Sequence, residues 1–161
     1  MSDRLNTCDG FGSRWQRSRC WRRRVCGAGD LRPRLSRPQM LQRHRGDPVA
    51  LQHLHTDAAQ LLPSNAAAFH ALLHRLRGRP VVINEWASWR DNCSAEVAAF
   101  QTASVTFGGR VAFIGVDVAD DTKSAKRFLR VFLSAYPSYS DPHQAIARSL
   151  EASGLYPQTL F

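Results

Sequence analysis

Four cysteines are the residues of this chain that could carry thiol or metal chemistry. Three of them, Cys8, Cys20 and Cys26, lie in an arginine-rich N-terminal segment, and Cys93 stands alone in the remainder. The spacings of the first three match no zinc-binding pattern, so we interpret them as unpaired thiols in a disordered segment and expect no metal site. A lone thiolate at Cys93 could attack a disulfide, but a second thiol is needed to resolve the mixed disulfide that forms.

The histidines offer a second set of possible ligands. His70 and His74 are four residues apart, which places both on one face of a helix. Such a pair can chelate a metal ion, but we interpret it as part of a solvated helix face. No third ligand can be placed near His53 and His55, so we expect these two to be surface residues.

Alternating strands and helices must position Cys93. Val81 to Ala87 is a β-rich run that leads into the segment before Cys93, and Val111 to Asp117 is apolar nearly throughout, as a buried parallel strand is. Ser64 is a plausible N-cap, and Gly78 stands where a helix end favours a left-handed residue. The pattern predicts helices over residues 64–77, 93–105, 122–133 and 142–151, strands over 81–87, 111–117 and 158–161, and an extended segment over 136–139. This alternation indicates an α/β fold with a parallel-centred sheet.

The segment Trp86-Ala87-Ser88-Trp89-Arg90-Asp91-Asn92-Cys93 resembles the Trp-Ala-Ser-Trp-Cys-x-x-Cys segment of thioredoxin-like redoxins, the TlpA/ResA group of the AhpC/TSA-like superfamily. Further blocks resemble the family in the same order: residues 77–82, 110–117, 136–142 and 154–161. The resemblance covers about residues 64–161. It implies a thioredoxin-like α/β fold with a central mixed sheet flanked by helices. It also implies a C-terminal truncation, because the family continues with a hairpin partner and a covering helix.

The resemblance assigns roles to individual residues. Arg90 stands at the position of the attacking cysteine, and Cys93 stands at the position of the resolving cysteine. The block Gly154 to Phe161 is similar to the stretch that contains the family's cis-proline, at Pro157. Tyr156 and Pro157, together with Trp89, would then form the groove in which a substrate or peptide docks.

Three functions are compatible with an Arg-x-x-Cys motif. The first is a redoxin related to thiol–disulfide oxidoreductases, with impaired or lost dithiol activity because the attacking thiol is missing. The second is single-thiol redox chemistry at Cys93, with Asp91 or Asn92 capping the helix so that Cys93 lies in its first turn. The third is a non-catalytic interaction module on a thioredoxin scaffold. Expected partners are protein thiols or disulfides, or a docked peptide, and no cofactor is expected.

Charge and composition divide the chain into three parts. Residues 1–46 hold twelve arginines against three aspartates, whereas ten basic residues face ten acidic ones from Asp47 onward. The formal charge of +9 therefore belongs to the N-terminal segment. We expect a basic, disordered arm over residues 1–48, a linker over 49–63 and the redoxin domain over 64–161. The arm lacks a groove-reading motif, so no specific nucleic-acid partner is expected, and a misassigned translation start is an alternative origin for it.

The chain shows neither a secretory signal nor an apolar run of the ~20 residues that a membrane helix needs. Taken as written, it is expected in the cytoplasm, although related redoxins often work outside it. The last predicted strand would lie at a sheet edge without its usual partner. Such an edge favours self-association.

Overall fold

The computed structural model describes residues 39, 42 and 44–161. The elements in chain order are α3 (Val49–Thr56), β1 (Leu61–Pro63), α4 (Ala66–Arg75), β2 (Val81–Trp86), α5 (Asp91–Phe107), β3 (Ala112–Val118), α6 (Thr122–Val131), β4 (Ser138–Asp141), α7 (Ala145–Ser149) and β5 (Gln158–Leu160). Strands and helices alternate through most of this order, so the predicted α/β architecture is confirmed.

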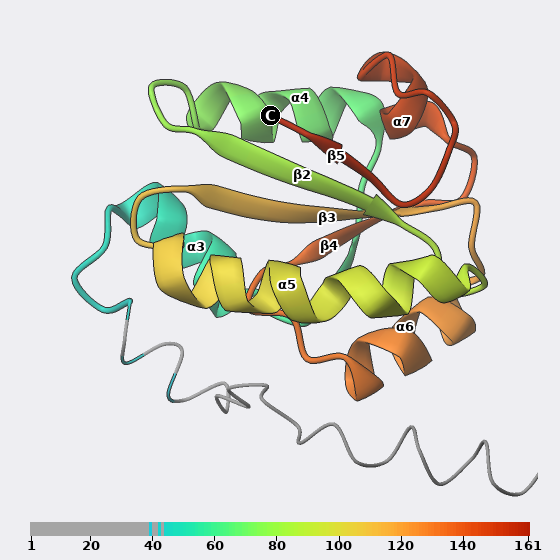
Figure 1. Ribbon diagram of the computed structural model, residues 1–161. Helices are drawn as coiled ribbons and strands as arrows, with labels where there is room; N and C mark the ends of the chain where they lie inside the picture. Colours follow the sequence, from blue (N-terminus) through green and yellow to red (C-terminus); the bar gives the residue numbers. More distant parts are fainter. Residues whose placement is uncertain (1–38, 40–41, 43) are drawn as a thin grey trace, which may run out of the picture. The chain divides into compact units, whose positions relative to one another are not determined.

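The five strands form one mixed sheet in the order β1-β4-β3-β2-β5. The pairs β1–β4, β4–β3 and β3–β2 are parallel, and β5 runs antiparallel to β2. Helices α4 and α7 lie on one face of the sheet, and α5 and α6 lie on the other (Figure 1). This is the flanked mixed sheet that the sequence predicts.

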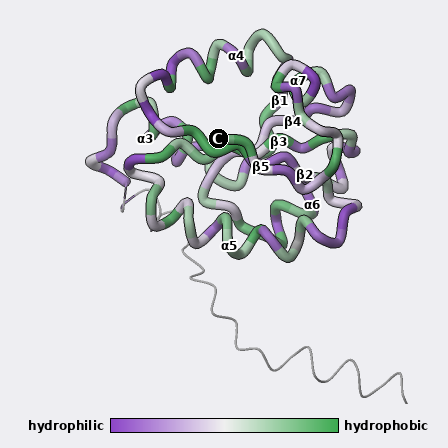
Figure 2. The backbone as a smooth tube through the Cα atoms, turned by 45° about the horizontal axis from the view of Figure 1, so that its top comes forward, coloured by the Kyte–Doolittle hydropathy of each residue, from purple (hydrophilic) through white to green (hydrophobic). Residues whose placement is uncertain are grey.

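The core follows from the burial of the central strands. Every residue of β3 is buried, as expected for a parallel strand covered on both faces. One core cluster joins the strands to α3, α4 and α7 through side chains such as Leu51, Phe69 and Ile146, each 0% exposed. Along α4 and α5, hydrophobic and hydrophilic segments alternate (Figure 2), as in helices with one buried face.

Several local signals act as the sequence predicts, with small shifts. Gly78 has a φ of +81°, the left-handed conformation expected after a helix. The N-cap of α4 is Asn65 rather than Ser64, because the Asn65 side chain accepts a hydrogen bond from the Ala68 N–H at 2.9 Å. Asp141 accepts hydrogen bonds from Ala145 and Ala147, yet α7 begins only at Ala145, three residues later than Pro142.

Residues 49–63 differ from the linker expected there. They form α3 and the edge strand β1, which pairs with β4 in register Leu61 to Ser138. Leu51 and Leu54 of α3 are buried, and His55 is also buried rather than on the surface. The expected arm over residues 1–48 lies mostly outside the described residues, as do Cys8, Cys20 and Cys26. His44, at its end, is 5% exposed and packs against α3.

Candidate functional site

The predicted site lies where β2 ends and α5 begins. Helix α5 starts at Asp91, and Arg90 is its N-cap, with an extended backbone and no side-chain capping bond. Cys93 is therefore the third residue of the helix, and its N–H donates to the Arg90 carbonyl at 3.1 Å. Because α5 starts two residues earlier than expected, Arg90 stands at the helix N-terminus and Cys93 lies within the first helical turn.

Trp86 closes the space around Cys93 from the sheet. Its indole N–H donates to the Ser138 hydroxyl oxygen at 3.2 Å, and its ring stacks on Phe128 at 4.7 Å between centroids. A Cβ at Gly115 would overlap the Ser138 hydroxyl and approach the indole nitrogen to 3.1 Å, so glycine leaves room for this hydrogen-bonded pair. Trp86 and Cys93 share an apolar cluster with two residues of α6, Ala125 and Leu129.

The Cys93 thiol is buried, and its surroundings disfavour the thiolate. Cys93 is 1% exposed. Burial raises the pKa of Cys93 above its ordinary value, and a backbone hydrogen bond from Ala87 only partly opposes this. Glu96 and Asp120 raise the pKa further, while Arg90 lowers it. The protonated thiol is consequently the favoured form near neutral pH.

Arg90 and Trp89 form the exposed part of the site. The Arg90 guanidinium carbon lies 4.8 Å from the centre of the Trp89 ring, within the range of a cation–π contact. The Trp89 indole N–H donates to the Ala119 carbonyl at 3.2 Å, which fixes the ring at the surface, where the residue is 52% exposed. The position assigned to the attacking sulfur thus carries a guanidinium stacked on an anchored indole.

Tyr156 and Pro157 lie at the same end of the sheet as Arg90 and Cys93. The peptide bond between them is cis, as the resemblance implies. Gln158 pairs with Glu85 in the antiparallel register of β5 and β2, so Pro157 is placed level with the end of β2. The structure therefore brings the sequence-predicted site residues to the same end of the sheet. Whether they dock a substrate stays a prediction.

Comparison with family models matches residues 61–161 to the AhpC/TSA family. The chain belongs to the AhpC/TSA family. Comparison with curated protein sequences finds no match.

Two solved structures share the fold of this AhpC/TSA-family chain. DsbF of MTB, in mixed oxidized and reduced forms, has 20% sequence identity and a TM-score of 0.50, over 53% of this chain and 63% of that one. A secreted Mycobacterium tuberculosis disulfide oxidoreductase homologous to E. coli DsbE has 20% identity and a TM-score of 0.51, over 55% of this chain and 64% of that one. The chain thus spans less than two thirds of each. These similarities establish the thioredoxin-like fold.

Two acidic residues of this AhpC/TSA-family chain stand beside the site and were missed by sequence reasoning. The Asp120 carboxylate accepts a hydrogen bond from the Ser88 N–H at 2.6 Å and so ties the loop before α5 to the end of β3. Asp117 is 0% exposed, and burial, followed by the nearby Asp120 carboxylate, raises its pKa to about 8. For Asp117, the signal available in the sequence was an acidic residue within an otherwise apolar strand.

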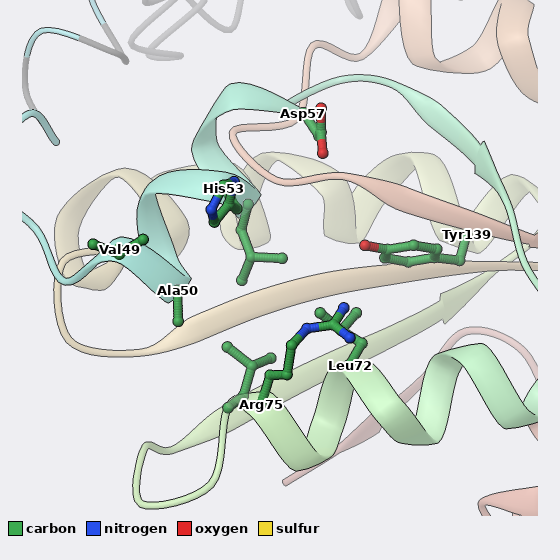
Figure 3. Close-up of a pocket in the computed structure, with 9 residues that line it drawn as sticks. Val49, Ala50, His53, Asp57, Leu72, Arg75 and Tyr139 are labelled. Atoms are coloured by element: carbon green, nitrogen blue, oxygen red, sulfur yellow. The ribbon is translucent and has the colours of Figure 1, made fainter.

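A separate cavity of about 630 Å³ lies between α3, α4 and β4. Figure 3 shows Arg75 of α4 and Tyr139 of β4 facing it, with His53 and Asp57 on the side of α3. None of the sequence-predicted site residues lines this cavity. Its polar groups are therefore independent of the thiol at Cys93.

None of the helices among the described residues combines the length and apolar character that a membrane span requires.

Proposed function

We propose that this protein is a thioredoxin-fold redoxin related to thiol–disulfide oxidoreductases, with dithiol exchange impaired because Arg90 occupies the attacking position. The burial of Cys93, at 1% exposure, carries the proposal. Thiol–disulfide exchange needs an exposed thiolate that can approach a disulfide sulfur in line. Cys93 has neither the exposure nor the lowered pKa that reactive cysteines have.

The N-terminus of α5, where the attacking thiol would stand, supports the same conclusion. Arg90 is exposed at the N-cap of α5, where the backbone N–H groups and the helix dipole would stabilise a thiolate. A guanidinium at this place cannot act as a nucleophile, because it carries no sulfur and remains protonated. On this proposal, Trp89, Tyr156 and Pro157 would contact a protein thiol or disulfide. The thiol that would react with it is missing at position 90.

A second candidate is a non-catalytic module that docks a peptide. The exposure of Trp89 favours it, since an anchored aromatic ring at 52% exposure offers apolar contact area to a partner. Tyr156 and Pro157 would supply the other wall of the groove. Single-thiol chemistry at Cys93 is the least favoured alternative, because the thiol is enclosed by Trp86 and Leu129.

A disulfide-reductase assay tests the proposal. The chain is prepared with Cys8, Cys20 and Cys26 replaced by serine, so that Cys93 is its sole thiol. Dithiothreitol-driven reduction of insulin should then proceed no faster than with the matched Cys93→Ser protein, since the enclosed thiol cannot reach the substrate disulfide. A Cys93-dependent rate clearly above that of the serine protein would refute impaired exchange.

A further inference from the structure

Three potential ligand residues meet at the end of α5 that is remote from Cys93. The Nδ1 atom of His44 lies 2.6 Å from Oδ2 of Asp47, and Nε2 of His55 lies 3.4 Å from the same oxygen. One donor atom from each residue falls within 4.8 Å of the other two. The residues come from the turn before α3 and from α3 itself, which sequence analysis assigned to an arm and a linker.

The cluster is enclosed and tightly packed. His44 and His55 are 5% and 6% exposed, and their rings stack at 3.8 Å between centroids. The glycine pair after α5 makes this approach possible. A Cβ at Gly108 would come within 2.9 Å of the His55 ring, and one at Gly109 would come within 2.9 Å of an Asp47 carboxylate oxygen.

One buried polar atom of this cluster lacks a partner in the part of the chain that the structure describes. It is Nε2 of His44, whereas Nδ1 of the same ring bonds to Asp47. A buried ring nitrogen without a partner loses its hydrogen bonds to water and so destabilises the folded state. Among the described residues only one nitrogen of this ring is hydrogen-bonded, so turning the ring toward a bound ion would break a single hydrogen bond.

We propose that His44, Asp47 and His55 bind a divalent transition-metal ion of the zinc type. Two imidazoles and one carboxylate form a borderline-soft donor set that suits Zn²⁺ and Co²⁺ and disfavours Ca²⁺ and Mg²⁺. Three protein ligands leave a fourth position of a tetrahedral ion for water or another small ligand.

Binding requires one ring to turn. The two imidazoles are nearly parallel, with 15° between their planes, so their lone pairs run side by side rather than toward one point. His55 is held on α3, and its Nε2 would exchange the 3.2 Å contact with the Gly108 carbonyl for a bond to the ion. His44 lies in the turn before α3, where its ring stacks on His55 and, among the described residues, is hydrogen-bonded only to Asp47. The His44 ring is therefore the one that moves.

A metal ion at this site would stabilise the fold and would not take part in the chemistry of the Cys93 thiol. Helix α5 has 17 residues, so its two ends lie about 25 Å apart. A bound ion would fasten the segment before α3 to the end of α5, and it would stabilise the folded chain because it binds only that state.

Titration with Co²⁺ tests the site, with Zn²⁺ as competitor. The untagged full chain is used with Cys8, Cys20, Cys26 and Cys93 replaced by serine, which removes binding by thiolates. We expect one Co²⁺ per chain, visible absorption of a tetrahedral ion, displacement by Zn²⁺ and a higher melting temperature with either ion.

Matched variants identify the ligands. His44→Gln and His55→Gln should each weaken binding by at least about 100-fold while circular dichroism confirms the fold. His53→Gln, on the exposed side of the same helix, should leave the affinity unchanged. The proposal is overturned if the folded parent binds neither ion, if both glutamine variants at positions 44 and 55 bind normally, or if His53→Gln weakens binding equally.

Discussion

An Arg90→Cys variant is expected to reduce insulin disulfides at least about tenfold faster than the parent chain. The substituted sulfur would stand at the N-cap of α5, an exposed position at which the helix dipole favours the thiolate. Cys93 follows three residues later in the first helical turn, which is the place of a resolving thiol. Initial rates with dithiothreitol as the reductant measure the gain.

Two matched proteins separate the chemistry from a general effect of removing the charge. Arg90→Ser should show no gain, since it removes the guanidinium without adding sulfur. Arg90→Cys combined with Cys93→Ser should, without dithiothreitol, attack a disulfide-bonded peptide, release one half of it as a thiol and accumulate the mixed disulfide with the other half, because the resolving thiol is absent. A folded Arg90→Cys protein without any gain would mean that the missing thiol is not the only defect.

Replacing Glu85 by leucine is expected to stabilise the chain by about 1–3 kcal/mol at pH 8. Glu85 is 0% exposed within the sheet, and neither of its carboxylate oxygens has a hydrogen-bond partner among residues 39, 42 and 44–161. Burial, followed by the nearby Asp141 carboxylate, raises its pKa from 4.5 to about 7. At pH 8 the folded protein thus holds an ionised, unpaired carboxylate that leucine removes.

The pH dependence of stability follows from the same residue. Between pH 4.5 and about 7, the folded state keeps the Glu85 proton that the unfolded state has lost. The free energy of unfolding therefore falls as the pH rises through this window, by up to about 1.4 kcal/mol per pH unit, and stays low above it. Asp117 adds a slope of the same sign up to about pH 8, so Glu85→Leu should reduce the dependence without abolishing it.

Urea unfolding at pH 5 and pH 8 measures both effects. Glu96→Leu is the control, since Glu96 is exposed on α5 and its loss should change stability by no more than about 0.5 kcal/mol. The interpretation fails if Glu85→Leu destabilises the protein at pH 8 and leaves the difference between the two pH values unchanged.

The central elements could be predicted because their local and tertiary preferences agree. The strand at β3 is apolar along its whole length, so only a strand buried on both faces fits it. Gly78 marks a helix boundary by a backbone conformation that depends on a few neighbouring residues only. The order of such elements was sufficient to indicate the fold.

The parts that escaped prediction depend on contacts between distant residues. Leu51 and Leu54 are spaced as on a helix, yet residues 49–63 were expected to be a linker and His53 and His55 to be surface residues. His55 is buried only because α3 packs against the end of α5, where its ring meets the Gly108 carbonyl. Gly108 is 53 positions from His55 in the sequence, so a local pattern cannot identify the two as neighbours.

The candidate site was predictable in its location and less so in its chemistry. The motif placed Arg90 and Cys93 at the start of a helix after the β2 strand, and both are there. Its spacing contains no information on how deeply Trp86 and α6 would enclose the thiol. The raised pKa values of Glu85 and Asp117 likewise depend on burial and on neighbouring carboxylates that only the folded chain brings together.

The most direct measurement is the rate at which iodoacetamide modifies Cys93 in the folded chain, followed across pH with the other three cysteines replaced by serine. A buried, protonated thiol predicts modification at least about 100-fold slower than that of a free thiol, with urea removing the protection. Modification at the rate of a free thiol, or a half-reaction point well below pH ~8.5, would contradict the enclosed thiol on which the proposed loss of exchange depends.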